Sequence, residues 1–398
     1  MRVIHDRQTQ ETVGELRADT AGCEGVVHFN NAGASLPPRS VVDRMVRHLH
    51  RESEIGGYEA ADEVSGELDA VRGDLAALVG ADREEIAITD SATRSWLSVF
   101  TAVPWTEGDR ILTAAPEYSS NLIAMLDLAR RRGVRVEQVP STPGGEMDVE
   151  ALRTLLDDDV RMVAVTHAPT NGGLVQPVER IGAVVAGSPA LYLVDACQTA
   201  GQVPLDLHRI GADALSGTGR KYLRAPRGTG FLAVLRAVLD TLAPAHLDLT
   251  SATLDGDRVR PRADAQRFEL FERSVAAVLG LGEAVRYYRG VGLDWVHDYV
   301  TALAAHLRAE LDRIPAVTVT DQGVHRSGIV TFRAETVTAS TLASRLRERG
   351  INVTVSRPPS TPWDTRHPDL DDLVRASVHY YNTPGEVARL CSEVTALC

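Results

Sequence analysis

Lys221 is the only lysine in the chain, and it ends a stretch rich in glycine and hydroxyl side chains, SGTGRK. A primary amine can condense with a carbonyl group, and small neighbours let the reacting partner approach closely. Any reaction that needs a side-chain amine therefore has one candidate here. An average lysine is a solvated surface residue, but the position of the sole lysine in a glycine-rich turn favours a reactive role.

Asp195 lies 26 residues before Lys221 (221 − 195), at the end of the apolar segment LYLVD. A buried carboxylate is costly unless it has a cationic partner. A protonated pyridine nitrogen is such a partner, and this pairing lets pyridoxal phosphate (PLP) act as an electron sink. We therefore expect PLP bound to Lys221 as a Schiff base, with Thr218 and Arg220 contacting its phosphate.

A second candidate phosphate site is the segment DSATRS at residues 90–95, on a predicted strand-to-helix turn. Backbone N–H groups at a helix N-terminus bind anions, and Ser91 and Thr93 add hydroxyl groups. Alone, this pattern fits an ordinary helix N-cap equally well. The lysine motif favours the phosphate interpretation.

The elements that must position these residues alternate between short β-rich runs and helical patterns. The runs MVAVT and LYLVD are continuously apolar, which suits a sheet covered on both faces and predicts an α/β doubly wound architecture. Ligands of such sheets bind at the carboxyl ends of the strands. We expect an N-terminal arm at residues 1–25, a large domain at 26–270 and a small α+β domain at 271–398. Residues 245–268 lose periodicity, which predicts a long connecting loop that covers part of the molecule.

Composition excludes several classes of function. The net charge of −12 and the absence of a basic stripe argue against a nucleic-acid partner. No apolar run approaches the roughly 20 residues that cross a bilayer, and the N-terminus has no signal-peptide pattern, so we expect a cytoplasmic protein. The four cysteines show no metal-ligand spacing, so neither a metal site nor disulfides are expected.

The chain resembles the class V aminotransferase and cysteine desulfurase branch of fold-type I PLP enzymes. The motifs that carry this resemblance are DACQ, SGTGRK, RGTGFL and RAS with a following YNT, and they extend from FNNAGA at residue 29 to VRASVHYYNT at residue 374. The resemblance implies a large domain with a mixed seven-stranded sheet between helices and a smaller α+β C-terminal domain. It also implies a homodimer with shared active sites.

The resemblance implies that Asp195 binds the pyridine nitrogen and that Lys221 shuttles the proton at the substrate α-carbon. Arg375 matches the arginine that clamps the substrate carboxylate, and Asn31 and Tyr58 are expected beside the substrate. Further positions that match cofactor contacts are Gln198 at the phenolate oxygen, Tyr118 where the family usually stacks a histidine, Thr170 in place of an asparagine, and Ser91, Ala92 and Thr93 on the phosphate-binding turn.

Two departures from the family pattern bear on the reaction. Cysteine desulfurases need a nucleophilic cysteine on a loop ahead of the substrate arginine, whereas that loop here, NVTVSRPPSTPWDTRHPDL, has none. Cys391 and Cys398 lie beyond Arg375, which argues against persulfide formation. The family also often donates a threonine across the dimer to the phosphate, and Arg273 is the residue that could replace it here.

A PLP site without that cysteine can still remove the α-proton and expel a leaving group from the β-carbon. We therefore expect a C–S β-lyase that cleaves an S-conjugate or sulfoxide of cysteine in a thiol-derived natural-product pathway. The motifs look like those of lyases in ergothioneine-type pathways. The alternatives are a decarboxylating oxidative deaminase, an aminotransferase or an epimerase, as in antibiotic biosynthesis, and a non-catalytic ligand sensor.

Overall fold

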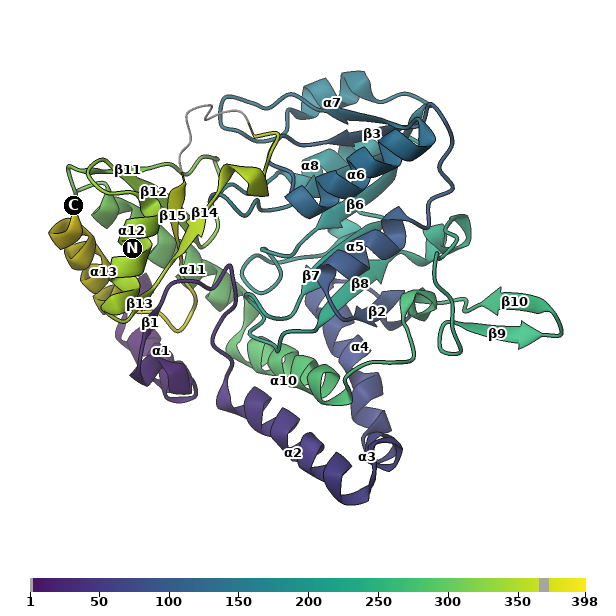
Figure 1. The fold of residues 1–398 in the computed structure, drawn as a ribbon, viewed down its shortest axis with the longest axis horizontal. Helices are drawn as coiled ribbons and strands as arrows, with labels where there is room; N and C mark the ends of the chain where they lie inside the picture. Colours follow the sequence, from purple (N-terminus) through teal and green to yellow (C-terminus); the bar gives the residue numbers. More distant parts are fainter. Residues whose placement is uncertain (1–2, 365–371) are drawn as a thin grey trace.

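The computed structural model describes residues 3–364 and 372–398, and its larger part is built on a seven-stranded sheet (Figure 1). The strand order is β2-β8-β7-β6-β5-β3-β4, and only β8 runs antiparallel to its neighbours. This mixed sheet confirms the predicted architecture. Its strands are β2 (Ile86–Thr89), β3 (Arg110–Thr113), β4 (Arg135–Gln138), β5 (Val160–Thr166), β6 (Leu191–Asp195), β7 (Ala214–Thr218) and β8 (Gly230–Val234).

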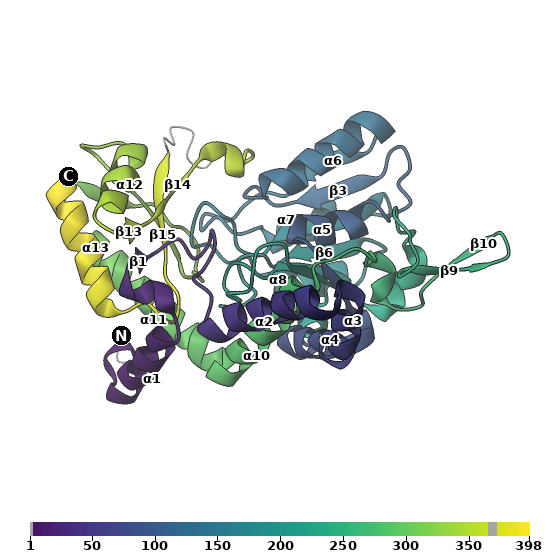
Figure 2. The ribbon, with the colours of Figure 1, turned by 60° about the horizontal axis from the view of Figure 1, so that its bottom comes forward.

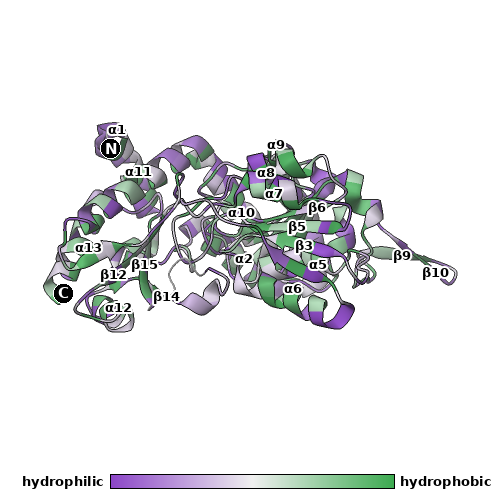
Figure 3. Cartoon of the chain, turned by 90° about the horizontal axis from the view of Figure 1, so that it is seen from above, coloured by the Kyte–Doolittle hydropathy of each residue, from purple (hydrophilic) through white to green (hydrophobic). Residues whose placement is uncertain are grey.

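Helices cover both faces of this sheet because alternate strand residues point to opposite sides. On one face Leu193 packs in a cluster with Trp96 of α5 and Met125 of α6, and on the other Val194 packs in a cluster with Leu75 of α4. Figure 3 shows the strands largely in hydrophobic colours. The helices of this part are α4 (Ser65–Val79), α5 (Ala92–Phe100), α6 (Ser119–Arg132), α7 (Val149–Leu155), α8 (Val178–Val185), α9 (Leu207–Ile210) and α10 (Val275–Val291), with 3-10 turns at Arg83–Glu85, Arg236–Thr241 and Ala265–Phe268.

The C-terminal part is a four-stranded antiparallel sheet with helices packed against it. Its strand order is β11-β12-β15-β14, and α11, α12 and α13 contact it or one another. This is the predicted smaller α+β unit. Its elements are α11 (Leu293–Leu311), β11 (Val317–Val319), β12 (Ile329–Ala334), α12 (Ala339–Glu348), β13 (Ile351–Asn352), β14 (Thr354–Ser356), a 3-10 turn at Pro358–Ser360, β15 (Leu373–Ser377) and α13 (Pro384–Leu397).

The N-terminal segment connects the two parts (Figure 2). Its 3-10 turn Val3–His5 packs on α11, strand β1 (Val27–His28) pairs in parallel with β13, and α2 (Arg39–Ile55) packs on α10. The remaining elements of this segment are α1 (Arg7–Ala18), the 3-10 turn Ala21–Glu24 and α3 (Gly57–Glu63). The domain boundaries after residues 25 and 270 stay a prediction.

The segment predicted as a connecting loop forms a β-hairpin instead, which corrects the prediction for residues 245–268. Strands β9 (Ala252–Asp255) and β10 (Arg258–Pro261) pair antiparallel and project from the body of the molecule (Figures 1 and 2). Asp255 precedes Gly256, whose φ of +60° suits a tight hairpin turn. The hairpin strands are exposed rather than packed on the described residues, and Leu254 and Val259 are 77% and 54% exposed.

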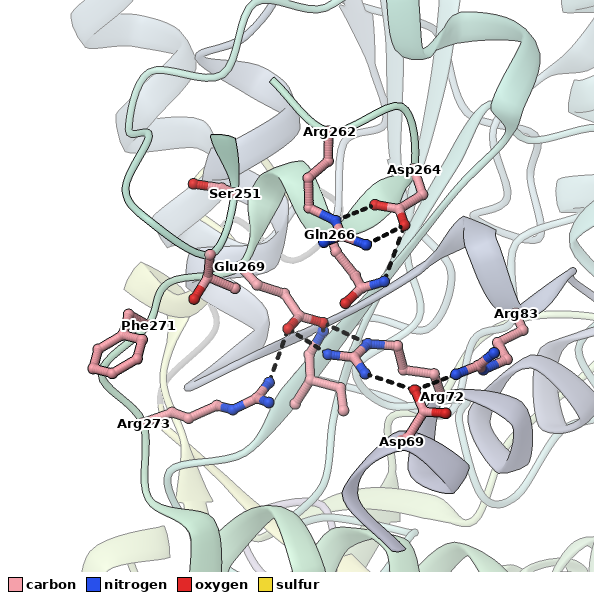
Figure 4. Close-up of polar contacts among 12 residues, drawn as sticks. Asp69, Arg72, Arg83, Ser251, Arg262, Asp264, Gln266, Glu269, Phe271 and Arg273 are labelled. Carbon is pink, nitrogen blue, oxygen red and sulfur yellow. Dashed lines mark hydrogen bonds and ion pairs between the residues drawn. The ribbon is translucent and has the colours of Figure 1, made fainter. Parts of the chain in front are cut away.

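A buried ion-pair network lies where the hairpin segment returns to the sheet (Figure 4). Glu269 accepts two hydrogen bonds from Arg72 at 2.9 and 2.7 Å, one from Arg273 at 2.8 Å and one from the Ile88 backbone at 2.9 Å. Arg273 thus pairs with a carboxylate of its own chain.

Two further findings concern residues 3–364 and 372–398 only. No helix among them has both the length and the apolar character needed to span a membrane. These residues also contain no cluster of three or more His, Cys, Asp or Glu side chains arranged to hold a metal ion.

Candidate active site

One cavity gathers the residues that follow the parallel strands at their carboxyl ends. It holds about 510 Å³ of empty space, its open mouth included. All ten residues predicted to contact the cofactor line it. They are Ser91, Ala92 and Thr93 after β2, Tyr118 after β3, Thr170 after β5, Asp195 and Gln198 at β6, and Thr218, Arg220 and Lys221 at β7.

Asp195 is a buried carboxylate without a cationic partner in the described part of the chain. Its Oδ1 accepts a hydrogen bond from the Cys197 backbone at 2.9 Å, and its Oδ2 accepts one from Asn121 at 3.0 Å. Neutral donors alone leave a buried negative charge uncompensated. A bound cation at this end of the cavity would complete the site.

A second buried carboxylate, Glu117, supports Asp195 through Asn121. Asn121 Nδ2 is 2.9 Å from Glu117 Oε1 and donates to Asp195 as well. Glu117 also accepts hydrogen bonds from Thr113, Thr166 and the Tyr118 backbone. Burial raises the pKa of Glu117, and the hydrogen bonds from Thr166 and Asn121 oppose that shift. The network fixes the plane of the Asp195 carboxylate.

Lys221 follows β7 and faces the same cavity. Burial lowers the pKa of its amine, and the positive charge of Arg220 acts in the same direction. A lower pKa increases the fraction of neutral amine, which is the nucleophilic form. The described chain contains no salt bridge to Lys221 that would hold it protonated.

The first turn of α5 forms the opposite end of the cavity. Ser91 caps the helix by accepting a hydrogen bond from Arg94 N at 3.2 Å, so the N-cap interpretation is correct for its hydroxyl group. The backbone N–H groups of Ala92 and Thr93 are the first of the helix and have no intrahelical acceptor. A side chain at Gly230 of β8 would place its Cβ 2.4 Å from the Ser91 carbonyl carbon. The close approach of β8 to this turn therefore requires glycine at position 230.

Two further residues complete the phosphate end. Thr218 lies at the end of β7, where its hydroxyl is 3.4 Å from the Thr229 carbonyl oxygen, and Arg220 donates to the Gly33 carbonyl oxygen. Helix N–H groups, a hydroxyl and a guanidinium suit an anion such as a phosphate.

Arg375 lies on β15, is 8% exposed and has no carboxylate partner in residues 3–364 and 372–398. Its Nη1 donates to Thr170 Oγ1 at 2.6 Å and to the Thr170 carbonyl oxygen at 3.0 Å, and its Nη2 is 3.5 Å from Asn30 Oδ1. Its buried Nε has no hydrogen-bond partner among the described residues. Burial lowers the pKa of Arg375 to about 10. This buried cation is therefore uncompensated within the described residues, and although it does not itself line the cavity, it contacts Thr170, which does.

Asn31 and Tyr58, which were expected beside the substrate, do not line the cavity of their own chain. Within one chain, this corrects the expectation. The Asn31 side-chain amide is hydrogen-bonded within the protein. It donates to Ser377 O at 2.7 Å and to Asn382 Oδ1 at 3.2 Å, and it accepts from the Tyr381 hydroxyl. Tyr58 is 74% exposed on α3 and does not line the cavity. Of the two adjacent asparagines, it is Asn30 and not Asn31 whose side chain contacts Arg375.

Sequence reasoning also missed Glu117 and Asn121. Both lie in APEYSSN, next to the predicted Tyr118. The position of Glu117 after an apolar strand was the one local pattern that could have pointed to a buried carboxylate. Its link to Asp195 through Asn121 could not be predicted from sequence spacing. His167, which follows β5, is 4% exposed, and burial lowers its pKa to about 4.

The cavity fits PLP at each of its ends. A buried carboxylate without a cation would face the pyridine nitrogen, an amine with lowered pKa would face the aldehyde, and an open helix N-terminus would face the phosphate. Gln198 also lines the cavity, with Nε2 at 3.2 Å from the Ala32 carbonyl oxygen and a buried Oε1 that has no hydrogen-bond partner in the part of the chain that the structure describes. The unsatisfied atoms of this chain therefore match the polar groups of the cofactor.

Comparisons with known proteins show the family of the chain. The sequence model of the family Aminotransferase class-V matches residues 27–390. "Probable cysteine desulfurase 2" of Mycobacterium leprae (strain TN) is 30% identical over 402 residues, covering 95% of each chain. "Probable cysteine desulfurase" of Synechocystis sp. is 28% identical over 375 residues, covering 91% of this chain and 88% of that one.

Solved structures show the same fold. An apo cysteine desulfurase from Thermococcus onnurineus NA1 has a TM-score of 0.89 at 24% identity, covering 96% of this chain and 97% of that one. The cystine C-S lyase C-DES, in complex with cysteine persulfide, has a TM-score of 0.86 at 23% identity, covering 94% of this chain and 99% of that one.

Proposed function

Because the chain belongs to the class V aminotransferase family, we propose that it is a PLP-dependent lyase that cleaves the C–S bond of an S-substituted cysteine. The substrate is an S-conjugate or a sulfoxide of cysteine. For a thioether, R–S–CH2–CH(NH3+)–COO− and water give R–SH, pyruvate and ammonium. We place this reaction in secondary metabolism. The observation that carries the proposal is one cavity in which the only lysine meets a buried carboxylate that has no cation.

The residues that would hold the cofactor are those that line the cavity. Lys221 would bind it covalently, Asp195 would pair with its pyridine nitrogen, and the first turn of α5 with Thr218 and Arg220 would bind its phosphate. When bound, PLP withdraws electrons from the substrate α-carbon. Asp195 keeps the pyridine nitrogen protonated, and Asn121 keeps Asp195 in orientation.

Arg375 and Lys221 act on the substrate. The substrate α-carboxylate supplies the anion that Arg375 lacks, and the free Nε offers it a charge-assisted hydrogen bond. Lys221 Nζ, whose neutral fraction increases because burial lowers its pKa, takes the proton from the α-carbon. The electron pair of that C–H bond forms the new double bond to the β-carbon, and the C–S pair leaves on sulfur.

The cysteines of this chain favour release of the thiol over its capture as a protein persulfide. The loop at residues 352–370 contains no cysteine, although its residues 365–370 lie outside the described structure. Burial raises the pKa of Cys391 to about 12 and raises that of Cys197 well above its ordinary value. A thiol with a raised pKa is a poor nucleophile.

We also propose that the enzyme is a homodimer with shared active sites. The projecting hairpin exposes Leu254 and Val259, and Tyr58 is exposed rather than directed to its own cavity. Apolar side chains on a projecting hairpin suit contact with a second copy. Sedimentation equilibrium would give twice the chain mass if this is correct.

Turnover of defined S-alkyl cysteines tests the reaction. PLP-loaded protein is incubated with S-methyl- and S-benzyl-L-cysteine, and pyruvate, ammonia and thiol are measured in parallel. Equal amounts of the three products, absent in Lys221→Ala, support the lyase. Carbon dioxide with an aldehyde or a keto acid that retains its sulfur substituent, an inverted amino acid, or no reaction would each contradict it. Carbon dioxide with an aldehyde would indicate the oxidative deaminase, and the keto acid would indicate the aminotransferase. An inverted amino acid would indicate the epimerase, and no reaction would indicate the ligand sensor.

A further inference from the structure

Arg224 combines an unfavourable backbone conformation with complete burial. Its φ is +61°, and it is the one non-glycine residue with positive φ in the described part of the chain. A residue with a Cβ atom is disfavoured in this left-handed region. Such a conformation persists only where the surrounding structure imposes it, and it is found most often at functional sites. Arg224 is three residues after Lys221 and is 0% exposed.

All three nitrogen atoms of the Arg224 guanidinium are bound by the protein. Nε donates to the Leu36 carbonyl oxygen at 2.8 Å, Nη1 donates to Tyr380 Oη at 3.0 Å, and Nη2 donates to Thr20 Oγ1 at 2.5 Å. Within residues 3–364 and 372–398 no carboxylate pairs with this cation. A buried guanidinium held by three neutral acceptors is fixed in position and in plane.

Aromatic rings replace the missing counter-ion. The guanidinium carbon lies 4.5 Å from the ring centre of Tyr381, 5.0 Å from that of Tyr380 and 5.7 Å from that of Tyr287. Cation–π attraction strengthens when the pair is desolvated, as here. We call these three tyrosines, with Thr20 and Leu36, the Arg224 cage.

The cage joins the turn that carries Lys221 to the segments that carry the substrate side. The Arg224 backbone N–H donates to the Lys221 carbonyl oxygen at 3.0 Å and closes the turn. Tyr380 follows Arg375 by five residues (380 − 375), and Leu36 ends the loop whose Asn30 contacts Arg375. One side chain therefore links the reacting amine to both segments around the carboxylate-binding guanidinium.

We propose that Arg224 is a positioning residue that sets the spacing between the Lys221 amine and the Arg375 guanidinium. This inference rests on the proposed function, because the spacing matters only when a cofactor on Lys221 and a carboxylate on Arg375 belong to one substrate complex. The α-hydrogen must lie within reach of the amine, and small misplacements of reacting groups reduce rates steeply. Arg224 touches neither the cavity nor the reacting atoms, so it acts through Lys221.

The test compares variants by their proton transfer, independently of the leaving group. Arg224→Lys keeps the charge but has one nitrogen for three acceptors. Thr20→Val removes the acceptor of Nη2 together with the hydrogen bond that the Thr20 hydroxyl donates to the Leu16 carbonyl oxygen, and it leaves the rest of the cage in place. Thr12→Val, on the same N-terminal arm but outside the cage, is the matched control, because its exposed hydroxyl contacts only the Gln8 carbonyl oxygen.

Each protein is loaded with PLP, and two quantities are measured per bound cofactor. One is the rate at which the α-hydrogen of L-alanine exchanges in D2O, followed by NMR. The other is the pH midpoint of the visible absorption band. We expect exchange to fall about tenfold or more in Arg224→Lys and about two- to fivefold in Thr20→Val, each with a shifted midpoint. Thr12→Val should match the wild type.

Melting temperature separates positioning from stability. If Arg224→Lys and Thr20→Val melt earlier but exchange at the wild-type rate per bound cofactor, Arg224 is merely structural and the inference is wrong. If Arg224→Lys does not fold, Thr20→Val decides alone by the same criterion. If the wild type itself neither forms the visible band nor exchanges the α-hydrogen, it is the proposed function that fails.

Discussion

Asn121 Nδ2 lies 3.0 Å from Asp195 Oδ2, although 74 residues separate them in sequence. The same nitrogen donates to Glu117 at 2.9 Å, so one amide group serves two buried carboxylates. Both hydrogens of the amide are used, which prevents it from rotating. Asp195 is thereby aimed into the cavity before any cofactor arrives.

Removing this amide should weaken cofactor binding and stability together. Asn121→Leu keeps the volume but leaves each carboxylate one donor short, which should lower the free energy of unfolding by about 2–4 kcal/mol. The dissociation constant of PLP, measured by its fluorescence, should rise at least about tenfold. Ser120→Ala on the same helix is the control. An unchanged PLP affinity in Asn121→Leu would show that Asp195 needs no such support.

Replacing Lys221 should abolish covalent attachment of the cofactor. Lys221→Ala and Lys221→Arg should lose more than about a thousandfold in turnover, because neither supplies a neutral primary amine. Borohydride reduction followed by peptide mapping should label a peptide containing residue 221 in the wild type alone. A reduced cofactor fixed at any other residue would overturn the assignment.

Arg375 should govern substrate affinity more than the chemical step. Arg375→Gln removes the charge-assisted contact to the α-carboxylate, worth about 1.5–3 kcal/mol, so KM should rise roughly 10- to 100-fold. Arg333→Gln, an exposed arginine on the neighbouring strand β12, is the control. Steady-state kinetics check this, and a variant whose kcat alone falls would argue for a different role.

Acid should destabilise the cofactor-free protein through His167. Burial lowers its pKa from 6.5 to about 4, so between these values the unfolded chain binds more protons than the folded one. Stability present above pH 6.5 is therefore lost as the pH falls toward 4, by about 3 kcal/mol in full. Urea unfolding at pH 7.5 and 5.0 measures the loss. His167→Gln should show a smaller difference, and His28, His306 and His379, whose pKa values burial also lowers, should contribute to what remains.

The two ion-pair groups of Figure 4 should differ in their contribution to stability. Glu269→Gln removes the carboxylate that makes both short hydrogen bonds to the buried Arg72, leaves it only the longer contact with Asp69 at 3.6 Å, and should cost about 3–5 kcal/mol. Asp264→Asn breaks the more exposed pair with Arg262 at 2.9 Å and should cost at most about 1 kcal/mol. Thermal and urea unfolding compare them. Equal losses would mean that Glu269 contributes by packing rather than by charge.

Much of the fold and of the cofactor site could be predicted from the sequence. Continuous apolar runs mark strands buried on both faces, and the ends of parallel strands meet at one edge of a sheet, so Asp195 and Lys221 were expected together. The hairpin at residues 252–261 was missed although Asp255–Gly256 is a turn signal. Its exposed strands lack the apolar alternation of a packed strand.

Asn30 and Asn31 show that sequence spacing does not predict which of two adjacent side chains reaches the site. Identical residue types at adjacent positions differ only in which way each side chain points. Asn31 is turned into contacts with Ser377 and Asn382, and Asn30 toward Arg375. These partners lie about 350 residues away, and no local pattern specifies them.

The sequence by itself determined that one amine exists, that it follows a strand, and that a carboxylate ends the strand before it. Those are properties of residue type and of local periodicity. Only the tertiary structure decided that Asp195 and Arg375 lack counter-ions among the described residues, that Asn121 joins two carboxylates, and that Arg224 is caged by tyrosines. Whether a buried charge is compensated depends on every group packed around it, and those groups come from distant parts of the chain.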